Sequence, residues 1–261
     1  MSPRRHSTTF LVPIGVLVAV AAFGVLVVGL RHGTAGGLAP EAAVGAPALS
    51  PSPTPSAGPS GTPTRWLVAE TRTATVVYRR PSSSAPTLAT LPRLNAHGCV
   101  TVMLVRRAAT VAGATWYQVW LPRRPNFSSG WVSAAGVGTY STPAEIVIDL
   151  SERRLTVFRD GRSEGRFSVA VGSAAYPTPP GLFFVAEKTT PIPGGPYGVL
   201  ALGLSGYQPR LPSLGALAIH GTDDVALIGK AVSDGCIRMS NADVLKVSRW
   251  VPTGSPVLIR Q

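Results

Sequence analysis

Residues 219–243 read IHGTDDVALIGKAVSDGCIRMSNAD and contain one cysteine and one histidine. His220 and Cys236 lie sixteen positions apart, with Gly229 and Gly235 between them. A thiol becomes a good nucleophile near neutral pH when a neighbouring imidazole favours the thiolate. The spacing does not place the two side chains on one face of a helix, so we expect a loop to fold His220 back onto Cys236.

Two residues near Cys236, Gly235 and Arg238, have properties that suit the chemistry of a reactive thiol. A glycine directly before Cys236 permits a tight turn in which the backbone amides of Gly235 and Cys236 can face a developing oxyanion. The guanidinium of Arg238 can hold a carboxylate through two parallel hydrogen bonds. The segment therefore indicates acyl transfer by a cysteine on a peptide that carries free carboxyl groups.

This segment resembles the signature of the L,D-transpeptidase (YkuD-type) catalytic domain, HGT…IG…S-x-GC-[IV]-R-[ML]-x-N-x-D, and SNAD at 240–243 continues the match. Upstream, Val171-Gly172 and YPTPPG at 176–181 are similar to the family's G…TPxG segment. The resemblance spans residues 144–261 and implies a β-rich catalytic domain with one or two short helices. It also implies the following site: catalytic Cys236 and His220; oxyanion or supporting residues Gly235, Ser233 and Gly221; and substrate-binding residues Arg238, Asn241 and Tyr197.

The resemblance further implies the reaction. Cys236 would attack the carbonyl between the third residue and the terminal D-alanine of a peptidoglycan tetrapeptide stem, releasing D-alanine and leaving a thioester. The amine of a neighbouring stem would resolve the thioester and form a 3→3 cross-link. No cofactor and no metal is expected, because acyl transfer needs only a nucleophile, a base and oxyanion donors. Carbapenem-type inhibitors are expected to acylate Cys236.

Alternatives remain open at this stage. Water or a protein amine as acceptor would make the protein an L,D-carboxypeptidase or a protein-to-peptidoglycan anchoring enzyme. An alternative of another class is a non-catalytic wall-binding protein. The cysteines allow a disulfide between Cys99 and Cys236, a zinc site formed by His220 and Cys236 with Asp223 or Asp224, or a packing role for Cys236. We expect Cys99 to be a buried packing thiol and the two aspartates to be loop and cap residues.

One residue departs from the family pattern. Many members carry a histidine two residues before the cysteine, whereas this chain has Asp234. A carboxylate that faces Cys236 should oppose thiolate formation, and one that points to solvent should matter little. We therefore expect Asp234 to affect the rate and its pH dependence more than the reaction itself.

The composition predicts a mainly β chain. The sequence holds 28 glycines and 25 prolines among 261 residues, which favours turns and strands over helical bundles. Alternating or β-branched runs predict strands at 75–78, 100–105, 116–121, 131–133, 145–150 and 154–158. One helix is expected after Ser240, which forms a capping box with Asp243 and precedes valines at 244, 247 and 251; Pro252 ends it.

The amino-terminal third predicts a membrane attachment. Residues 10–30 carry no charge and are long enough to cross a bilayer, and Arg4 and Arg5 precede them. We predict a cytoplasmic tail (1–9), a transmembrane anchor (10–30) in the cytoplasmic membrane and a Pro/Ser-rich linker (31–64). The catalytic domain would then lie outside this membrane, in the cell-wall space. A cleaved signal peptide and a buried core helix are the alternatives.

Residues 65–143 carry most of the positive charge. They contain nine arginines and one glutamate in a chain with net charge +12. The runs WYQV at 116–119 and GWV at 130–132 resemble bacterial SH3-like domains, so we expect a small β-barrel or sandwich. Its basic surface is interpreted either as a solvated face or as a site for anionic cell-wall polymers. Nucleic acid is not an expected partner, because the sequence has no RNA-binding signature and the segment is predicted to be exported.

Overall fold

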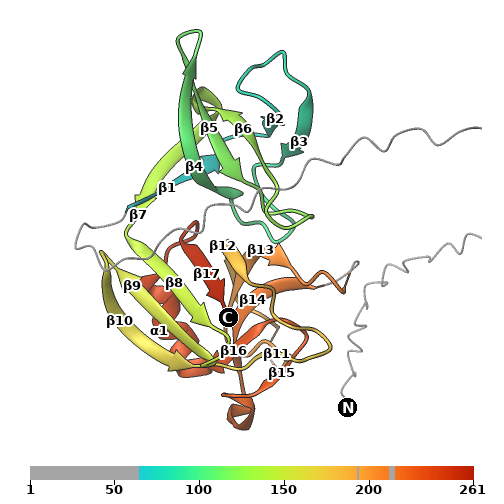
Figure 1. Ribbon diagram of the computed structural model, residues 1–261, viewed down its shortest axis with the longest axis vertical. Coiled ribbons are helices and arrows are strands. Elements are labelled where there is room, and N and C mark those ends of the chain that lie inside the picture. The colour runs from blue at the N-terminus through green and yellow to red at the C-terminus, as the bar shows by residue number, and fades with distance from the viewer. Residues whose placement is uncertain (1–64, 193, 212–214) are drawn as a thin grey trace, which may run out of the picture. The chain divides into compact units, whose positions relative to one another are not determined.

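A computed structural model describes residues 65–192, 194–211 and 215–261, drawn in colour in Figure 1. The chain divides into two units, 1–55 and 56–261, and the described residues all belong to the second. The predicted anchor at 10–30 and linker at 31–64 lie outside the described residues. Within the described part, no helix has the length and apolar character needed to cross a membrane.

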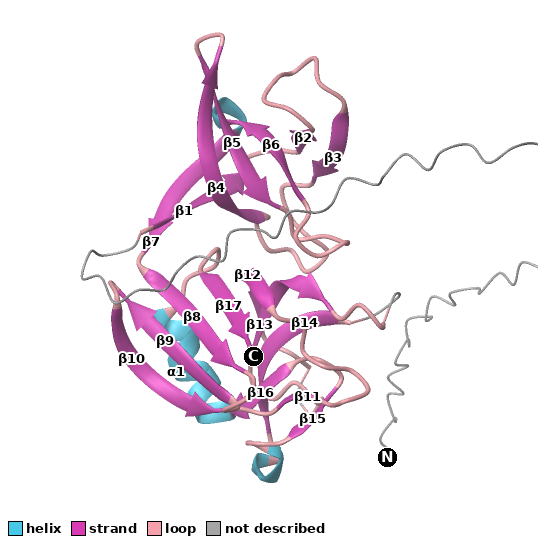
Figure 2. Cartoon of the chain, in the orientation of Figure 1, coloured by secondary structure: helices cyan, strands magenta, loops and turns pink. Residues whose placement is uncertain are grey.

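The first half of the described chain forms one antiparallel sheet of seven strands, in the order β3-β2-β6-β5-β4-β1-β7 (Figure 2). Its strands are β1 (Trp66–Thr71), β2 (Thr75–Tyr78), β3 (Thr87–Leu91), β4 (Val102–Val111), β5 (Ala114–Trp120), β6 (Ser129–Ser133) and β7 (Val137–Thr142). A short 3-10 helix, η1 (Ala134–Gly136), precedes β7. Val77, Met103, Val119 and Val132 are fully buried and form much of its core. Each strand predicted in this half is present, and β4 is longer than expected.

The second half forms a mixed sheet of eight strands, in the order β10-β9-β8-β17-β12-β13-β14-β16 (Figure 1). These strands are β8 (Ala144–Asp149), β9 (Arg154–Arg159), β10 (Arg162–Ser168), β12 (Gly181–Thr189), β13 (Ala201–Tyr207), β14 (Ala216–Thr222), β16 (Ile237–Ser240) and β17 (Pro256–Arg260). Two short strands, β11 (Val171–Gly172) and β15 (Ala231–Ser233), pair in parallel beside it, and η2 (Val225–Leu227) follows β14. The prediction of a mainly β fold is confirmed.

The one α-helix among the described residues is α1 (Asn241–Trp250), which packs against the eight-stranded sheet (Figure 2). Ser240 is its N-cap: its hydroxyl accepts a hydrogen bond from the Asp243 amide at 3.1 Å and donates one to the Asp243 carboxylate at 2.7 Å. Val244 and Val247 are fully buried in the core beneath the sheet. The predicted capping box and apolar spacing are therefore confirmed.

The two sheets meet in a small apolar cluster. Val68, Val102 and Leu104 of the seven-stranded sheet pack with Phe184 of β12, and all four side chains are buried. The chain passes from one sheet to the other at Pro143, between β7 and β8. The eight-stranded sheet carries His220 and the strand that follows Cys236, so it positions the candidate site.

Candidate active site

His220 and Cys236 are brought together by the neighbouring parallel strands β14 and β16. The register pairs Ile219 with Ile237 and His220 with Arg238, so Cys236, just before β16, lies beside Ala218. Alternate residues of a strand point to the same face. Ile219 and Ile237 are buried in the core, so Cys236 and His220 share the opposite face. The expected loop back to the cysteine is a crossover through η2 and β15.

The imidazole of His220 has a fixed tautomer. Its Nδ1 lies 2.7 Å from the backbone oxygen of Gly221. A carbonyl can only accept a hydrogen bond, so Nδ1 carries the proton and Nε2 is left as the basic nitrogen. The side chain is only 2% exposed, and the Tyr197 ring packs edge-on against it with 4.9 Å between ring centroids. Burial lowers the pKa of His220, and Arg238 lowers it further against the opposing effect of the Gly221 carbonyl.

The thiol of Cys236 is half-buried and lies between two backbone groups of β14. Its Sγ is 3.7 Å from the oxygen of Ala216, and the amide of Ala218 hydrogen-bonds to the sulfur. Burial raises the pKa of Cys236, and this outweighs the lowering by the Ala218 amide and Arg238; Asp234 adds a smaller increase. The resting pair is therefore a neutral thiol beside a neutral imidazole. His220 can act as a general base during attack rather than hold a preformed thiolate.

The turn that leads into Cys236 is fixed by two buried hydroxyls. The Ser233 hydroxyl accepts a hydrogen bond from the Gly235 amide at 3.1 Å and donates one to the Cys236 carbonyl at 2.5 Å. The Thr178 hydroxyl accepts from the Gly172 amide at 2.8 Å and donates to the Gly235 carbonyl at 2.9 Å. Gly235 has φ +112°, a conformation that side chains rarely adopt. Both polar groups of its backbone are thus held by the protein.

These contacts change the expected role of Gly235. The sequence predicts its amide as an oxyanion donor, but the Ser233 hydroxyl already accepts that N–H. The Cys236 amide stays as the predicted donor. The sequence predicts no role for Thr178, although its place in the TPxG pattern is a usable signal for the hydrogen bond that it donates to Gly235.

Asn241, at the start of α1, and Gly221, in β14, support the site. The Asn241 side chain accepts a hydrogen bond from the Val199 amide at 3.1 Å and donates one to Asp223 at 2.6 Å. A Cβ on Gly221 would lie 2.1 Å from the Asn241 oxygen, so glycine is required for this close approach. Asn241 therefore holds the segment that follows Tyr197 against the helix. Both of these side-chain hydrogen bonds are made to groups of the protein.

Arg238 presents a polar group without a protein partner. Its Nε is buried and makes no hydrogen bond to any residue that the structure describes. Its charge acts on both His220 and Cys236, which places it within the same site. A buried donor of this kind has a free-energy cost unless an incoming acceptor satisfies it.

The structure excludes one interpretation of the cysteines and corrects another. Cys99 and Cys236 are both free thiols, so the alternative of a disulfide between them is wrong. Cys99 is half-buried rather than buried, because it closes a turn in which the Asn95 side chain accepts from the Cys99 amide at 3.0 Å. Asp224 caps η2 by accepting from the Ala226 amide at 3.1 Å, as expected for a cap residue.

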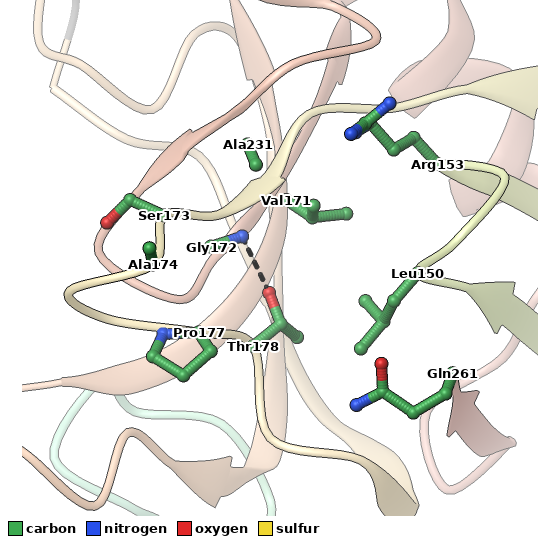
Figure 3. Close-up of a pocket in the computed structure, with 10 residues that line it drawn as sticks. All are labelled: Leu150, Arg153, Val171, Gly172, Ser173, Ala174, Pro177, Thr178, Ala231 and Gln261. Atoms are coloured by element: carbon green, nitrogen blue, oxygen red, sulfur yellow. Dashed lines mark hydrogen bonds between the residues drawn. The ribbon is translucent and has the colours of Figure 1, made fainter.

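A shallow pocket of about 280 Å³ lies on the Thr178 side of the turn. Figure 3 shows the Thr178 hydroxyl directed at the Gly172 amide, while the Ser173 side chain points away from this bond. Neither Cys236 nor His220 lines this pocket. The reacting side chains therefore face a different part of the surface.

Comparisons with known proteins identify the family of this chain. Residues 143–259 match the family described as the L,D-transpeptidase catalytic domain, YkuD. The chain is 37% identical over 152 residues to the protein named L,D-transpeptidase YkuD in Bacillus licheniformis, covering 56% of this chain and 87% of that protein. The Bacillus subtilis protein of the same name is 37% identical over 122 residues, or 47% of this chain and 69% of that protein. A solved L,D-transpeptidase structure from Mycobacterium tuberculosis H37Rv has 18% identity and a TM-score of 0.42, covering 60% of this chain and 98% of that chain. The chain belongs to the YkuD family of L,D-transpeptidases and is an enzyme of that family.

Proposed function

We propose that this enzyme forms 3→3 cross-links in peptidoglycan through a thioester on Cys236. The observation that carries the proposal is the tautomer of His220. Its Nδ1 is bound to Gly221, so Nε2 is the free basic nitrogen on the strand beside the thiol. A neutral imidazole in this position can accept the thiol proton and later return it, as acyl transfer requires.

The proposed reaction has two steps. In the first, Nε2 of His220 takes the proton from Sγ of Cys236 as sulfur attacks the carbonyl carbon before the terminal D-alanine. The C–N bond then breaks, the proton passes to the leaving D-alanine amine, and a thioester remains. In the second, the amine of another stem attacks the thioester and gives its proton to His220. The C–S bond breaks, and the thiol recovers that proton.

Three groups of the chain support these steps. The Cys236 amide, next to the reacting sulfur, is the proposed oxyanion donor. The buried Nε of Arg238 has no partner among the described residues and suits a stem carboxylate. Tyr197 covers His220 edge-on, is 47% exposed and is thus available to a bound stem.

We also propose a place for the enzyme in the cell. Residues 10–30 would anchor it in the cytoplasmic membrane, and residues 31–64 would separate the anchor from the folded part, leaving the catalytic domain (144–261) in the cell-wall space. The SH3-like segment 65–143 would bind anionic wall polymers. In support, Arg106 lies 4.1 Å over the ring of Trp120 and Arg107 lies 5.2 Å over that of Trp131, so cationic side chains are held at the surface of this sheet.

The test of the reaction is product analysis. The purified full chain is incubated with disaccharide-tetrapeptide and the products are identified by mass spectrometry. We expect a cross-linked dimer that has lost one D-alanine, and no product from the Cys236→Ala variant. Trimming to tripeptide without dimer would contradict the transpeptidase proposal and favour the L,D-carboxypeptidase. An unchanged substrate would favour the wall-binding protein.

A carbapenem supplies an independent test of the thioester chemistry. Intact mass measurement should show one covalent adduct on the parent, and peptide mapping should locate it on Cys236. Binding of the full chain to purified cell walls tests the polymer site, and it should weaken as salt rises beyond about 0.15 M, where the Debye length is about 8 Å. Binding that ignores salt would contradict an electrostatic site.

A further inference from the structure

The loop between β5 and β6, residues 121–128, lies against the connection between β13 and β14. The Asn126 side chain donates a hydrogen bond to the Tyr207 oxygen and accepts one from the Tyr207 amide, both at 2.8 Å. The side-chain amide of Asn126 therefore makes the same pair of hydrogen bonds to the Tyr207 backbone that a neighbouring strand would make. The Tyr207 hydroxyl returns a hydrogen bond to the Pro122 oxygen at 3.3 Å.

Arg124 of the same loop holds the next residues. Its guanidinium donates to the backbone oxygens of Gln208 at 3.4 Å and Leu211 at 2.6 Å, and it stacks 4.6 Å from the centre of the Tyr207 ring. A planar guanidinium that donates to two backbone carbonyls at once fixes the path of the backbone between those carbonyls. Arg124 and Asn126 together therefore determine where residues 207–211 lie.

The loop itself is anchored on β12 by an aromatic contact. The Phe127 ring packs against Phe183, with 5.2 Å between ring centroids. A Cβ on Gly181 would lie 2.4 Å from the Phe127 ring, so the ring can pack here only because residue 181 has no side chain. The loop is thus held at its tip as well as by its polar side chains.

Gln208 connects this arrangement to the catalytic turn. Its side chain is 1% exposed; Nε2 donates to the Pro177 oxygen at 2.6 Å, and Oε1 accepts from the Arg210 amide at 3.0 Å. A Cβ on Gly235 would be 3.0 Å from Nε2, so the amide lies directly against the turn that leads to Cys236. The residue after Pro177 is Thr178, which holds the Gly235 carbonyl.

We propose that Gln208 is a positioning residue for the Cys236 turn, and that Arg124 and Asn126 of the seven-stranded sheet fix it in place. The inference rests on the proposed function, because it concerns attack by Cys236. A buried amide whose two ends are both bound cannot shift without breaking a hydrogen bond. The seven-stranded sheet therefore contributes to the geometry of the reaction.

The test uses the full chain and compares two reactions of the same thiol. Carbapenem acylation needs the correct angle of attack and the oxyanion donor, whereas alkylation by iodoacetamide needs only an accessible thiolate. Displacing a reacting group by about 1 Å can cost on the order of 100-fold in rate. We expect Arg124→Ala and Gln208→Leu to acylate about 10- to 100-fold more slowly, with alkylation changed less than about threefold.

Arg123→Ala is the matched control. Arg123 belongs to the same loop, and its guanidinium donates to the backbone oxygens of Leu88 in β3 and of the neighbouring Arg124, with no hydrogen bond to the described residues 207–211. The control removes the same charge, so its acylation rate should equal that of the parent. Equal rates for Arg124→Ala and Arg123→Ala would overturn the inference.

Two milder variants keep the test decisive if Gln208→Leu does not fold. Asn126→Asp keeps the hydrogen bond from the Tyr207 amide and loses the one to the Tyr207 oxygen, and Asn126→Ala loses both. Both should acylate more slowly than the parent while alkylating normally. Parallel loss of acylation and alkylation would indicate a general structural role and overturn the inference. A parent that forms no adduct would instead contradict the proposed function.

Discussion

Replacing Thr178 by valine removes one hydroxyl from beneath the catalytic turn and leaves the side chain nearly the same size. That hydroxyl is the acceptor for the Gly172 amide at 2.8 Å and the donor to the Gly235 carbonyl at 2.9 Å, and the residue is only 3% exposed. The variant therefore leaves two backbone groups buried with no partner in place of the lost hydroxyl.

The expected loss of stability follows from these two groups. A buried donor or acceptor that loses its partner costs about 1–3 kcal/mol. Two such groups should lower the free energy of unfolding by about 2–6 kcal/mol, which is a large share of the roughly 5–15 kcal/mol that holds a domain folded. At about 2–4 °C per kcal/mol for a protein of this size, the melting temperature should fall by roughly 4–24 °C.

Urea unfolding followed by circular dichroism measures the effect, with Thr178→Ser as the control. Serine keeps the hydroxyl and loses only a methyl group, so it should cost less than half as much as valine. A loss below about 0.5 kcal/mol for valine would refute the assigned hydrogen bonds, since surface substitutions produce changes of that size. Equal losses for serine and valine would contradict the hydroxyl as the source of the effect, because only valine lacks it.

Three further predictions concern the reacting groups. Cys236→Ala should abolish the carbapenem adduct while leaving the melting temperature unchanged, and any remaining turnover would contradict the thiol mechanism. His220→Ala should lower acylation by about 10²- to 10⁴-fold. Burial lowers the pKa of His220 below 6.5, so the neutral imidazole contributes to the free energy of unfolding above that pH. This contribution is lost as the pH falls through the lowered pKa. Urea unfolding of the parent should show the loss, and urea unfolding of His220→Ala should not. Asp234→Asn should lower the pKa of Cys236, because the carboxylate raises it, so iodoacetamide alkylation should begin at lower pH; a higher thiol pKa would contradict that assignment.

Local sequence patterns predicted the local structure well. Helix α1 follows from the Ser240–Asp243 capping box and the valine spacing, and β9 follows from the run predicted as a strand at 154–158. Pairings between distant strands carry no such local signal. Nothing near residues 256–260 indicates that β17 lies between β8 and β12. Cys99 was misjudged because its apolar neighbours suggested burial, whereas a turn at Asn95 keeps it half-exposed.

The residues of the candidate site likewise differ in whether the sequence carries a signal for them. Cys236 and His220 were predicted because their side chains have recognisable chemistry in a recognisable pattern. Thr178 and Gln208 act through single hydrogen bonds to segments 57 and 31 positions away, and buried polar side chains of this kind have no periodicity to reveal them. The engagement of the Gly235 amide by Ser233 likewise depends on the dihedral angles of one turn, which the glycine permits but does not specify.

The place of β17 has a consequence for how the chain folds. β17 follows the other described strands in the chain, yet it joins β8 to β12 near the middle of the eight-stranded sheet. Until residues 256–260 pair with them, β8 and β12 each expose an unpaired edge, and the pairs between β17 and β8 link residues more than a hundred positions apart. Such high contact order favours slow folding. The eight-stranded sheet therefore closes late in folding, when its central strand β17 pairs with both neighbours.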